Sequence, residues 1–330
     1  MCPAESFFGT DFFYSNALHV LTVIEVPIHI LGAFIIIART PKQMSSVKFN
    51  MLILHFCCVA LDLSLSVIFA PVLVVPVCSG YPLGLSVYFG ISTPFLIYLG
   101  ASLVGVTSVA ILSFFEDRYY RLVLGNASKS RRRKIYISFH YFLSFIFILP
   151  CYFGIPEQSY GRDHIKEMIP CFPNNVFDRP GFYVLATNNT IICICLGATV
   201  LFISGQILFY VHSTTMFLLK SDITKSEHTT RLQKQFFIAL CIQTSVPTVV
   251  LVIPGMYVVL ATRLEYFNQS HTNMFLLMVS LHGTLSTLTM LIVHRPYLRA
   301  TLSVLCLSEI NKRKTSDSQI GRTVFVTSVV

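Results

Sequence analysis

Seven long apolar runs dominate this sequence of 330 residues. Each run reaches the roughly 20 residues that an α-helix needs to cross the hydrocarbon core of a bilayer. A transmembrane β-barrel would instead show alternating polarity over segments of about 10 residues. We therefore predict an all-α integral membrane protein, a seven-transmembrane helix bundle with spans at about 17–38, 49–72, 87–115, 135–154, 191–218, 236–261 and 274–293.

The composition agrees with this class. The chain is 54% hydrophobic and 12% charged, whereas an ordinary globular protein is about 25% charged. No internal repeat and no soluble second domain stands out. No basic segment precedes the first span, so we expect a retained helix and not a cleaved signal peptide. The expected organisation is an extracellular N-terminus (1–16), a membrane domain (17–293) and a cytoplasmic tail (294–330).

Basic residues predict the orientation. Of the 24 Lys and Arg residues, 20 lie in the alternating segments 39–48, 116–134, 219–235 and 294–330. Cytoplasmic loops carry such an excess, which places the N-terminus outside and the C-terminus in the cytoplasm. The net charge of +9 then serves orientation and contact with anionic membrane lipid. Because the basic run 129–134 lies beside a span, we expect no nucleic-acid partner.

A charged cluster closes the third apolar run. It consists of Glu116, Asp117, Arg118 and Tyr119. Charge at the end of a span is tolerated, so its position alone does not demand a function. An acid-acid-Arg-aromatic cluster at the inner end of a third span is, however, typical of the G-protein switch of a helical receptor. Adjacent helical residues point about 100° apart, so only one acid can be the main partner of Arg118. The sequence leaves open which one.

Polar side chains also occur inside the spans, where they normally face the bundle interior and find partners. Glu25 and His29 are four residues apart and therefore share one face of the first helix. These groups form either a ligand pocket or conformational relay, or interhelical hydrogen bonds worth about 1 kcal/mol each. The set comprises Glu25, His29, Asn50, His55, Asp62, Gln243 and His282.

Prolines within the spans remove backbone donors and kink helices. They are Pro27, Pro94, Pro150, Pro247 and Pro254. Pro247 and Pro254 both lie in the sixth span, which makes that span the expected moving element and the two prolines its hinge candidates.

The cysteines divide by the expected topology. Five of the ten lie inside spans, where a small apolar packing role is the default. Cys2, Cys78 and Cys171 face the oxidising side, and three pairings among them are open. We predict the pair Cys78–Cys171. Asn188 and Asn268 head outward-facing glycosylation sequons.

Four strings in the right order carry a resemblance to a known family. They are ALHVLTVIEVP (17–27), FFEDRY (114–119), LQKQFFIALCIQ (232–243) and VHRPY (293–297). With them the chain resembles the nematode serpentine receptor class H (Srh) over about residues 15–300. The resemblance implies a seven-helix G-protein-coupled chemoreceptor of the plasma membrane, expected in sensory neurons or their ciliary membrane, with a small-molecule ligand and a heterotrimeric G protein as partners.

The same resemblance assigns roles to residues. Arg118 matches the inner arginine of the third helix, held by Glu116 or Asp117 while the receptor is inactive. Pro296 and Tyr297 match the seventh-helix motif. The chain departs from the broader rhodopsin-like pattern in having no tryptophan, no asparagine before Pro296, and a Cys78 too far from Arg118 for the usual disulfide. These departures weigh against a sodium site at Asp62.

The tail adds weaker signals. The pattern of residues 298–310 predicts an amphipathic eighth helix along the membrane, in which Cys306 is a palmitoylation candidate. The C-terminal residues 328–330 fit capture of a terminal carboxylate by a PDZ-type scaffold domain.

Rival functions find less support in the sequence. A ligand-gated channel or transporter would show charges lining a path and often repeated halves, and here intramembrane charges are few. An intramembrane enzyme would need a motif such as HExxH or a glycine-rich phosphate loop, and none occurs in a plausible context. We therefore predict no enzyme, no cofactor and no metal. A degenerate receptor that couples to nothing is not excluded by sequence.

Overall fold

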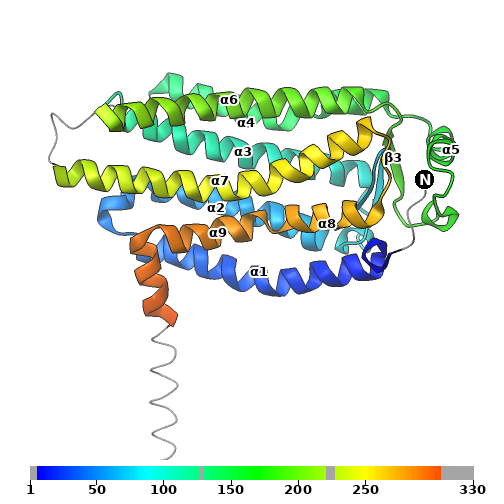
Figure 1. Cartoon of the computed structure of the whole chain (residues 1–330), viewed down its shortest axis with the longest axis horizontal. Helices are drawn as coiled ribbons and strands as arrows, with labels where there is room; N and C mark the ends of the chain where they lie inside the picture. The colour runs from blue at the N-terminus through cyan, green and yellow to red at the C-terminus, as the bar shows by residue number, and fades with distance from the viewer. Residues whose placement is uncertain (1–5, 126–129, 221–226, 306–330) are drawn as a thin grey trace, which may run out of the picture.

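The computed structural model describes residues 6–125, 130–220 and 227–305. Within these ranges seven helical segments are long and apolar enough to cross a membrane, which confirms the seven-helix fold. The helices lie side by side in an elongated bundle (Figure 1). They are α1 (Asp11–Arg39), α2 (Ser45–Leu63), α3 (Thr93–Leu122), α4 (Arg131–Ile146), α6 (Thr190–Lys220), α7 (Glu227–Arg263), and α8 (Gln269–Ser280) followed by α9 (His282–Val293).

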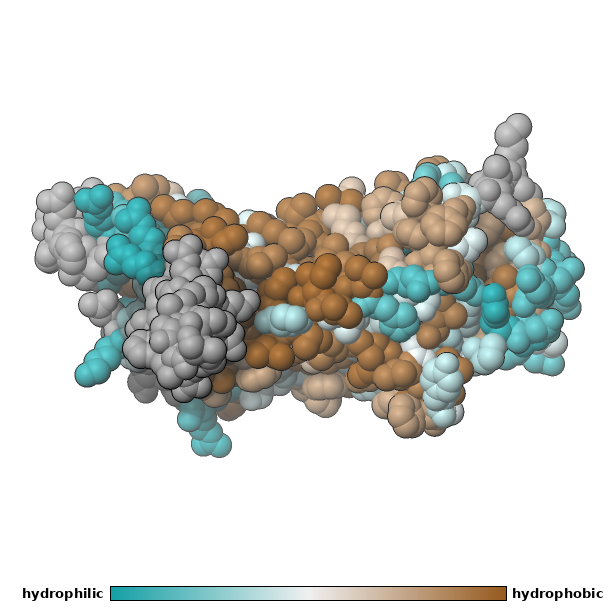
Figure 2. Space-filling view, turned by 90° about the horizontal axis from the view of Figure 1, so that it is seen from below, coloured by the Kyte–Doolittle hydropathy of each residue, from teal (hydrophilic) through white to brown (hydrophobic). Residues whose placement is uncertain are grey.

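The surface of the bundle matches a membrane environment. Figure 2 shows hydrophobic residues over the middle of the molecule and hydrophilic residues gathered toward its two ends. On α6 the side chain of Leu201 is 74% exposed. Water would penalise a continuous apolar surface of this kind, whereas lipid tails cover it. The chain is therefore a multi-pass membrane protein.

A small sheet at one end of the bundle was not predicted. It is antiparallel and three-stranded, in the order β1 (Pro71–Val74), β2 (Cys78–Pro82) and β3 (Tyr183–Ala186). The short helix α5 (Gln158–Met168) lies at the same end (Figure 1). We call this the sheet end and the opposite end, where α3 finishes, the cluster end. Cross-strand hydrogen bonds thus join the loop after α2 to the loop before α6.

The first helix begins earlier than predicted. The expected N-terminal segment ran to residue 16, but α1 starts at Asp11, because the Thr10 side chain caps it by accepting a hydrogen bond from the Phe13 N–H at 3.2 Å. Tertiary contacts hold this first turn against the sheet end: the Tyr81 hydroxyl donates to Asp11 at 2.7 Å, and Arg179 lies 2.6 Å from the same carboxylate.

The second and third spans have different bounds from those predicted. Helix α2 continues as a π-helical turn, Ser64–Ile68, and the predicted end at residue 72 lies in β1. Helix α3 begins at Thr93 and not at 87, with Pro94 in its first turn, where a proline costs no intrahelical hydrogen bond. It continues to Leu122. The charged cluster therefore lies within the last turns of α3 and not beyond its end.

The fourth and seventh spans are interrupted. Helix α4 is followed by a 3-10 segment, Leu149–Gly154, which completes the fourth span. The predicted seventh span, 274–293, is two helices separated at Leu281. After α9 the chain is helical again over residues 295–305, and this helix turns away from the bundle axis (Figure 1). Cys306, the rest of the predicted eighth helix and the C-terminal scaffold motif lie outside the described residues.

The predicted disulfide is wrong. Cys78 is a free thiol, whereas Cys171 is disulfide-bonded. Burial raises the pKa of the Cys78 thiol to about 12, so it is protonated and unreactive in thiol exchange. The free Cys78 excludes two of the three pairings that the sequence leaves open, and Cys2–Cys171 stays a prediction. Cys2 lies outside the described residues.

We expect peptide mapping without reductant to recover Cys171 linked to the N-terminal peptide that contains Cys2, and to recover Cys78 alkylated once the protein is denatured. The measurement is mass spectrometry of a non-reduced digest after alkylation in denaturant. A cross-linked peptide joining Cys78 to Cys171 would contradict this assignment.

Candidate functional site

The acidic pair at the cluster end is buried, and its two carboxylates bind arginines of different helices. Glu116 and Asp117 are each 1% exposed, and Arg118 is 7% exposed. Arg118 Nη2 donates to Asp117 Oδ2 at 2.8 Å. Glu116 accepts instead from Arg133 of α4, with Nε–Oε1 at 2.7 Å and Nη2–Oε2 at 2.8 Å. Asp117 is therefore the carboxylate that holds Arg118, which answers the question that the sequence left open.

Arg133 is a residue of this site that sequence reasoning missed. It was treated as one member of a basic run that serves orientation, yet it is 3% exposed and its guanidinium lies 4.2 Å from the Tyr120 ring centroid. The buried residues of α4 are Arg133, His140 and Ser144, a spacing that puts them on one helix face. This periodicity was the signal that would have identified Arg133 among its basic neighbours.

Asp117 is shared by more than one guanidinium. Besides Arg118, its Oδ2 accepts from Arg121 Nε at 2.7 Å, and its Oδ1 lies 3.4 Å from Arg133 Nη2. A buried carboxylate left without partners would cost several kcal/mol. Because Arg121 and Arg133 remain bound to Asp117, departure of Arg118 would not leave this carboxylate unpaired.

Residues of the fifth and sixth spans contact the same cluster. The Arg118 guanidinium lies 5.7 Å from the ring centroid of Phe236 on α7, a cation–π arrangement. Its Nε has no hydrogen-bond partner among the described residues. The Tyr119 ring packs against Tyr210 of α6, with centroids 5.3 Å apart. Displacement of either helix would therefore change the surroundings of Arg118 or Tyr119 directly.

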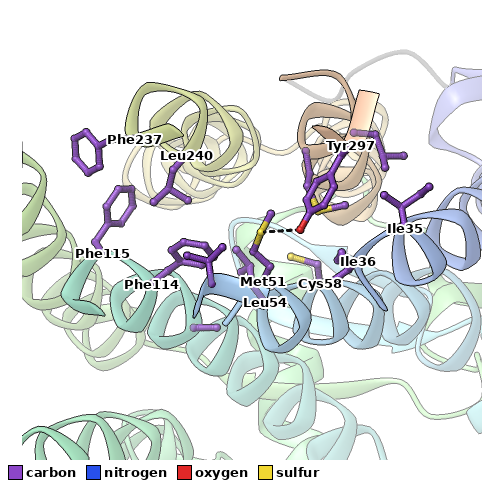
Figure 3. Packing of buried hydrophobic residues seen from close by; sticks show 14 of the residues in the cluster. Ile35, Ile36, Met51, Leu54, Cys58, Phe114, Phe115, Phe237, Leu240 and Tyr297 are labelled. Carbon is purple, nitrogen blue, oxygen red and sulfur yellow. Dashed lines mark hydrogen bonds between the residues drawn. The ribbon is translucent and has the colours of Figure 1, made fainter. Parts of the chain in front are cut away.

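Tyr297 anchors the segment after α9 in the bundle. It is fully buried in an apolar core (Figure 3), and its hydroxyl donates to the Met51 sulfur at 3.4 Å and lies 3.0 Å from the Thr40 hydroxyl. This burial raises the pKa of Tyr297. Pro296, the other residue of the predicted seventh-helix motif, is exposed. Tyr297 thus ties the seventh span to α1 and α2.

Gln243 joins the sixth span to the end of the seventh. Its side-chain oxygen accepts from His294 Nε2 at 2.8 Å. Burial lowers the pKa of His294 to about 4, so this histidine is neutral at pH 7. Helix α7 runs unbroken through Pro247 and Pro254 and bends along its length (Figure 1). The hinge role of these prolines stays a prediction.

The break in the seventh span provides hydrogen-bond donors for Asp62. The N–H groups of Gly283 and Thr284 donate to its two carboxylate oxygens at 3.1 and 2.8 Å. The first N–H groups of a helix have no intrahelical acceptor and attract an anion. His282 Nδ1 lies 2.7 Å from Asp62, and His29 Nε2 lies 3.2 Å from it. Asp62 therefore binds the seventh span to α1 and α2, and its oxygens are occupied by protein groups, which also weighs against a sodium site.

Glu25 lies near this network with fewer partners. It is fully buried on the same face of α1 as His29, as the sequence predicted. Its Oε2 accepts from Ser66 Oγ at 3.4 Å, and its Oε1 has no partner among the described residues. His55 extends the network to the His29 carbonyl, at 3.1 Å. His29, His55 and His282 thus form one cluster around Asp62 with Glu25 beside it. Gln243 belongs to the cluster end, and Asn50 is buried near the start of α2, away from Asp62.

The glycosylation candidates differ in their surroundings. Asn188 is exposed, although its side-chain oxygen accepts from the Thr190 N–H at 2.9 Å. Asn268 caps α8 by accepting from the His271 N–H at 3.1 Å, and its amide nitrogen donates to the Tyr266 hydroxyl at 3.2 Å. The amide nitrogen that a glycan would use is thus already engaged at Asn268.

Cavities occur outside the networks above. One, of about 380 Å³, is open to solvent at the sheet end and is lined by Phe8, His271 and Met274 among others. Another, of about 80 Å³, lies between α4 and α6 around His140 and Phe202. From the sequence we also predict that the ligand pocket lies among the outer halves of the third, fifth, sixth and seventh spans, under the loop 155–190. Neither of these cavities occupies that place.

Comparison with known proteins agrees with this architecture. A protein-family model described as "Serpentine type 7TM GPCR chemoreceptor Srh" matches residues 9–307. "Serpentine receptor class H-72" of Caenorhabditis elegans is 25% identical over 286 residues, which cover 84% of this chain and 81% of that protein.

Substituting Gly283 tests the contact between Asp62 and α9. In Gly283→Ala the new Cβ would lie 2.6 Å from Asp62 Oδ2 and 2.9 Å from the Cys58 carbonyl oxygen. We expect a loss of about 1–3 kcal/mol of stability. Gly205→Ala on α6 is the matched control, because nothing lies within 4 Å of its Cβ. Thermal unfolding in detergent is the measurement, and equal stability of both variants would contradict the expectation.

A double-mutant cycle tests the pair Glu116–Arg133. Arg133→Met leaves the buried Glu116 carboxylate without its guanidinium, so we expect a loss of about 3–5 kcal/mol. Glu116→Leu should cost less, because Arg133 Nη2 still lies 3.4 Å from Asp117 Oδ1. The double variant should lose much less, because both charges are removed together. Thermal unfolding of the four proteins gives the coupling. Additive losses would show that the two side chains do not act as a pair.

Proposed function

The chain belongs to the Srh family of seven-helix serpentine chemoreceptors, and from this membership we propose that it detects an extracellular small molecule and activates a heterotrimeric G protein through Arg118. The observation that carries the proposal is the state of Arg118, which is buried, held by Asp117 and covered by Phe236. Such an arrangement is that of a receptor at rest.

Activation in this proposal is a shift between two packings of the cluster end. A ligand shifts the equilibrium only if it binds one state more tightly than the other. In the active state α7 moves, Phe236 no longer covers the guanidinium, and Arg118 turns toward the G protein. Arg121, whose Nε lies 2.7 Å from Asp117 in this structure, and Arg133, which binds Glu116, keep these partners in the active state. Both buried acids therefore keep a partner, which lowers the cost of releasing Arg118.

The orientation and location of the receptor follow from the same proposal. The cluster end faces the cytoplasm, as the distribution of basic residues supports, and the sheet end with the disulfide of Cys171 faces outward. We propose the plasma membrane of a sensory neuron or its cilium as the site of action. A PDZ-type scaffold at the C-terminus is a further proposed partner.

Basal signalling tests the switch without a known ligand. Asp117→Asn weakens the charge-assisted bond to Arg118, and we expect ligand-independent G-protein dissociation to rise, by up to roughly tenfold. Arg118→Ala should abolish both basal and ligand-dependent signalling, also when combined with Asp117→Asn. Cells that express the chain with a G-protein dissociation sensor provide the measurement, at matched surface expression.

Arg39→Ala is the control, because Arg39 is an exposed arginine at the same end of the bundle and its removal should leave signalling unchanged. Signalling by Arg118→Ala at the level of the unmodified receptor would overturn the assignment. Ion flux through the purified protein without any G protein would favour a channel or transporter instead.

A further inference from the structure

Four cysteine thiols gather at the sheet end of the bundle. Cys151 lies in the 3-10 segment Leu149–Gly154 that completes the fourth span, and Cys195 lies on α6. Cys78 of β2 is close enough to Cys151 and Cys193 for their charges to act on it. Among the described residues, no group of three or more such side chains is arranged to hold a metal ion. The chemistry of these thiols is therefore that of pairs.

Cys151 and Cys195 are the pair in direct contact. Their two thiols are hydrogen-bonded to each other, and the elements that carry them pack against one another. Cys151 is 3% exposed, whereas Cys195 is half-buried. The sulfurs of a disulfide lie about 2.05 Å apart. Thiols that already touch therefore need only a small further approach to form one.

Both cysteines lie near the outer ends of their spans. Cys151 is three residues before Gly154, where the fourth span ends, and Cys195 is five residues after Thr190, where α6 begins. Five helical residues correspond to about 8 Å. At the same end of the molecule Cys171 is disulfide-bonded, which is the state of a cysteine in an oxidising compartment. The surroundings of Cys151 and Cys195 therefore favour oxidation.

We propose that Cys151 and Cys195 form a disulfide that ties the outer end of the fourth span to the outer end of α6. Each thiol gives up one proton and one electron, and a sulfur–sulfur bond forms between them. The protons and electrons pass to a small-molecule or protein disulfide of the oxidising compartment, which leaves as two thiols. Cys195, the more exposed of the two, attacks this disulfide first, and Cys151 then displaces the remaining thiol.

The bond would constrain a helix that few other contacts hold. Only 6% of the most apolar stretch of α6 is buried inside the protein. The 3-10 segment that carries Cys151 also contacts β3, so the disulfide would join α6 to the sheet end as a whole. Farther along α6, Tyr210 packs against Tyr119. The disulfide would thus fix one end of the helix whose other end contacts the switch. The proposal rests on the proposed outward orientation of the sheet end, but not on G-protein coupling.

Peptide mapping of the full-length chain tests the pair. The protein is purified from cells without reductant, alkylated in denaturant and digested for mass spectrometry. We expect a cross-linked peptide that joins Cys151 to the peptide containing Cys193 and Cys195. Since one residue separates the latter two cysteines, variants identify the partner. Cys195→Ser should abolish the cross-link, and Cys193→Ser, the matched control, should keep it.

The unfolding temperature separates a disulfide from simple packing. Without reductant, Cys195→Ser should unfold at a temperature lower by roughly 5 °C or more than the unmodified chain, because the bond no longer restricts the unfolded state. In reductant the unmodified chain loses the same bond, so the difference should shrink to what the loss of packing causes. A difference of the same size in both conditions would overturn the proposal.

The state of Cys171 distinguishes failure of the pair from failure of the orientation. Recovery of Cys151 and Cys195 both alkylated, with Cys171 still bonded, would overturn the pair and leave the proposed orientation standing. If Cys171 were alkylated as well, the outward orientation of the sheet end would fail together with the pair. A cross-link between Cys78 and Cys193 in place of the expected one would also overturn the proposal.

Discussion

The need to satisfy every polar group inside the bilayer shapes this molecule, and Asp62 is where the need is greatest. Its carboxylate lies at the meeting point of α1, α2 and α9 and is bound by the amides of Gly283 and Thr284 and by two histidines. In a continuous seventh helix those N–H groups would donate to carbonyl oxygens of the same helix. The break at Leu281 frees them for Asp62, so the interruption of the helix and the burial of the acid explain each other.

At the cluster end the buried carboxylates are paired with side chains, not with backbone N–H groups. Two buried acids meet three arginines from α3 and α4, with Glu116 given to Arg133 and Asp117 shared between Arg118 and its neighbours. Because Asp117 binds several guanidinium groups, the cluster is stable and one arginine can leave it without exposing an unpaired carboxylate. Departure of Arg118 leaves no acid unpaired, and Arg118 also contacts the sixth span through Phe236. Some buried polar atoms stay unsatisfied, among them Glu25 Oε1 and His140 Nε2, which have no partner among the described residues.

The parts of the fold that were predicted correctly rest on bulk properties. Seven apolar runs gave seven spans because burial in lipid depends on the length and hydrophobicity of a segment and little on its neighbours. The boundaries were less accurate, since local contacts set them: the Thr10 cap and the Asp11 contacts extend α1 beyond its apolar run. The sheet was missed because its strands are short and because β3 pairs with β2 from a loop distant in the sequence. The Cys78–Cys171 pair failed for a related reason, since a shared compartment does not bring two thiols together.

By itself the sequence determined the membrane class, the number of spans, the polar residues that gather around Asp62 and the presence of an acid-acid-arginine cluster at the end of the third span. These follow from composition and periodicity, which act along one helix at a time. Only the tertiary structure decided that Asp117 holds Arg118, that Arg133 holds Glu116, and that the seventh span opens to bind Asp62. Each of these choices depends on which side chain of a neighbouring helix comes within hydrogen-bonding distance. That proximity is a property of helix packing, which no single segment of the chain encodes alone.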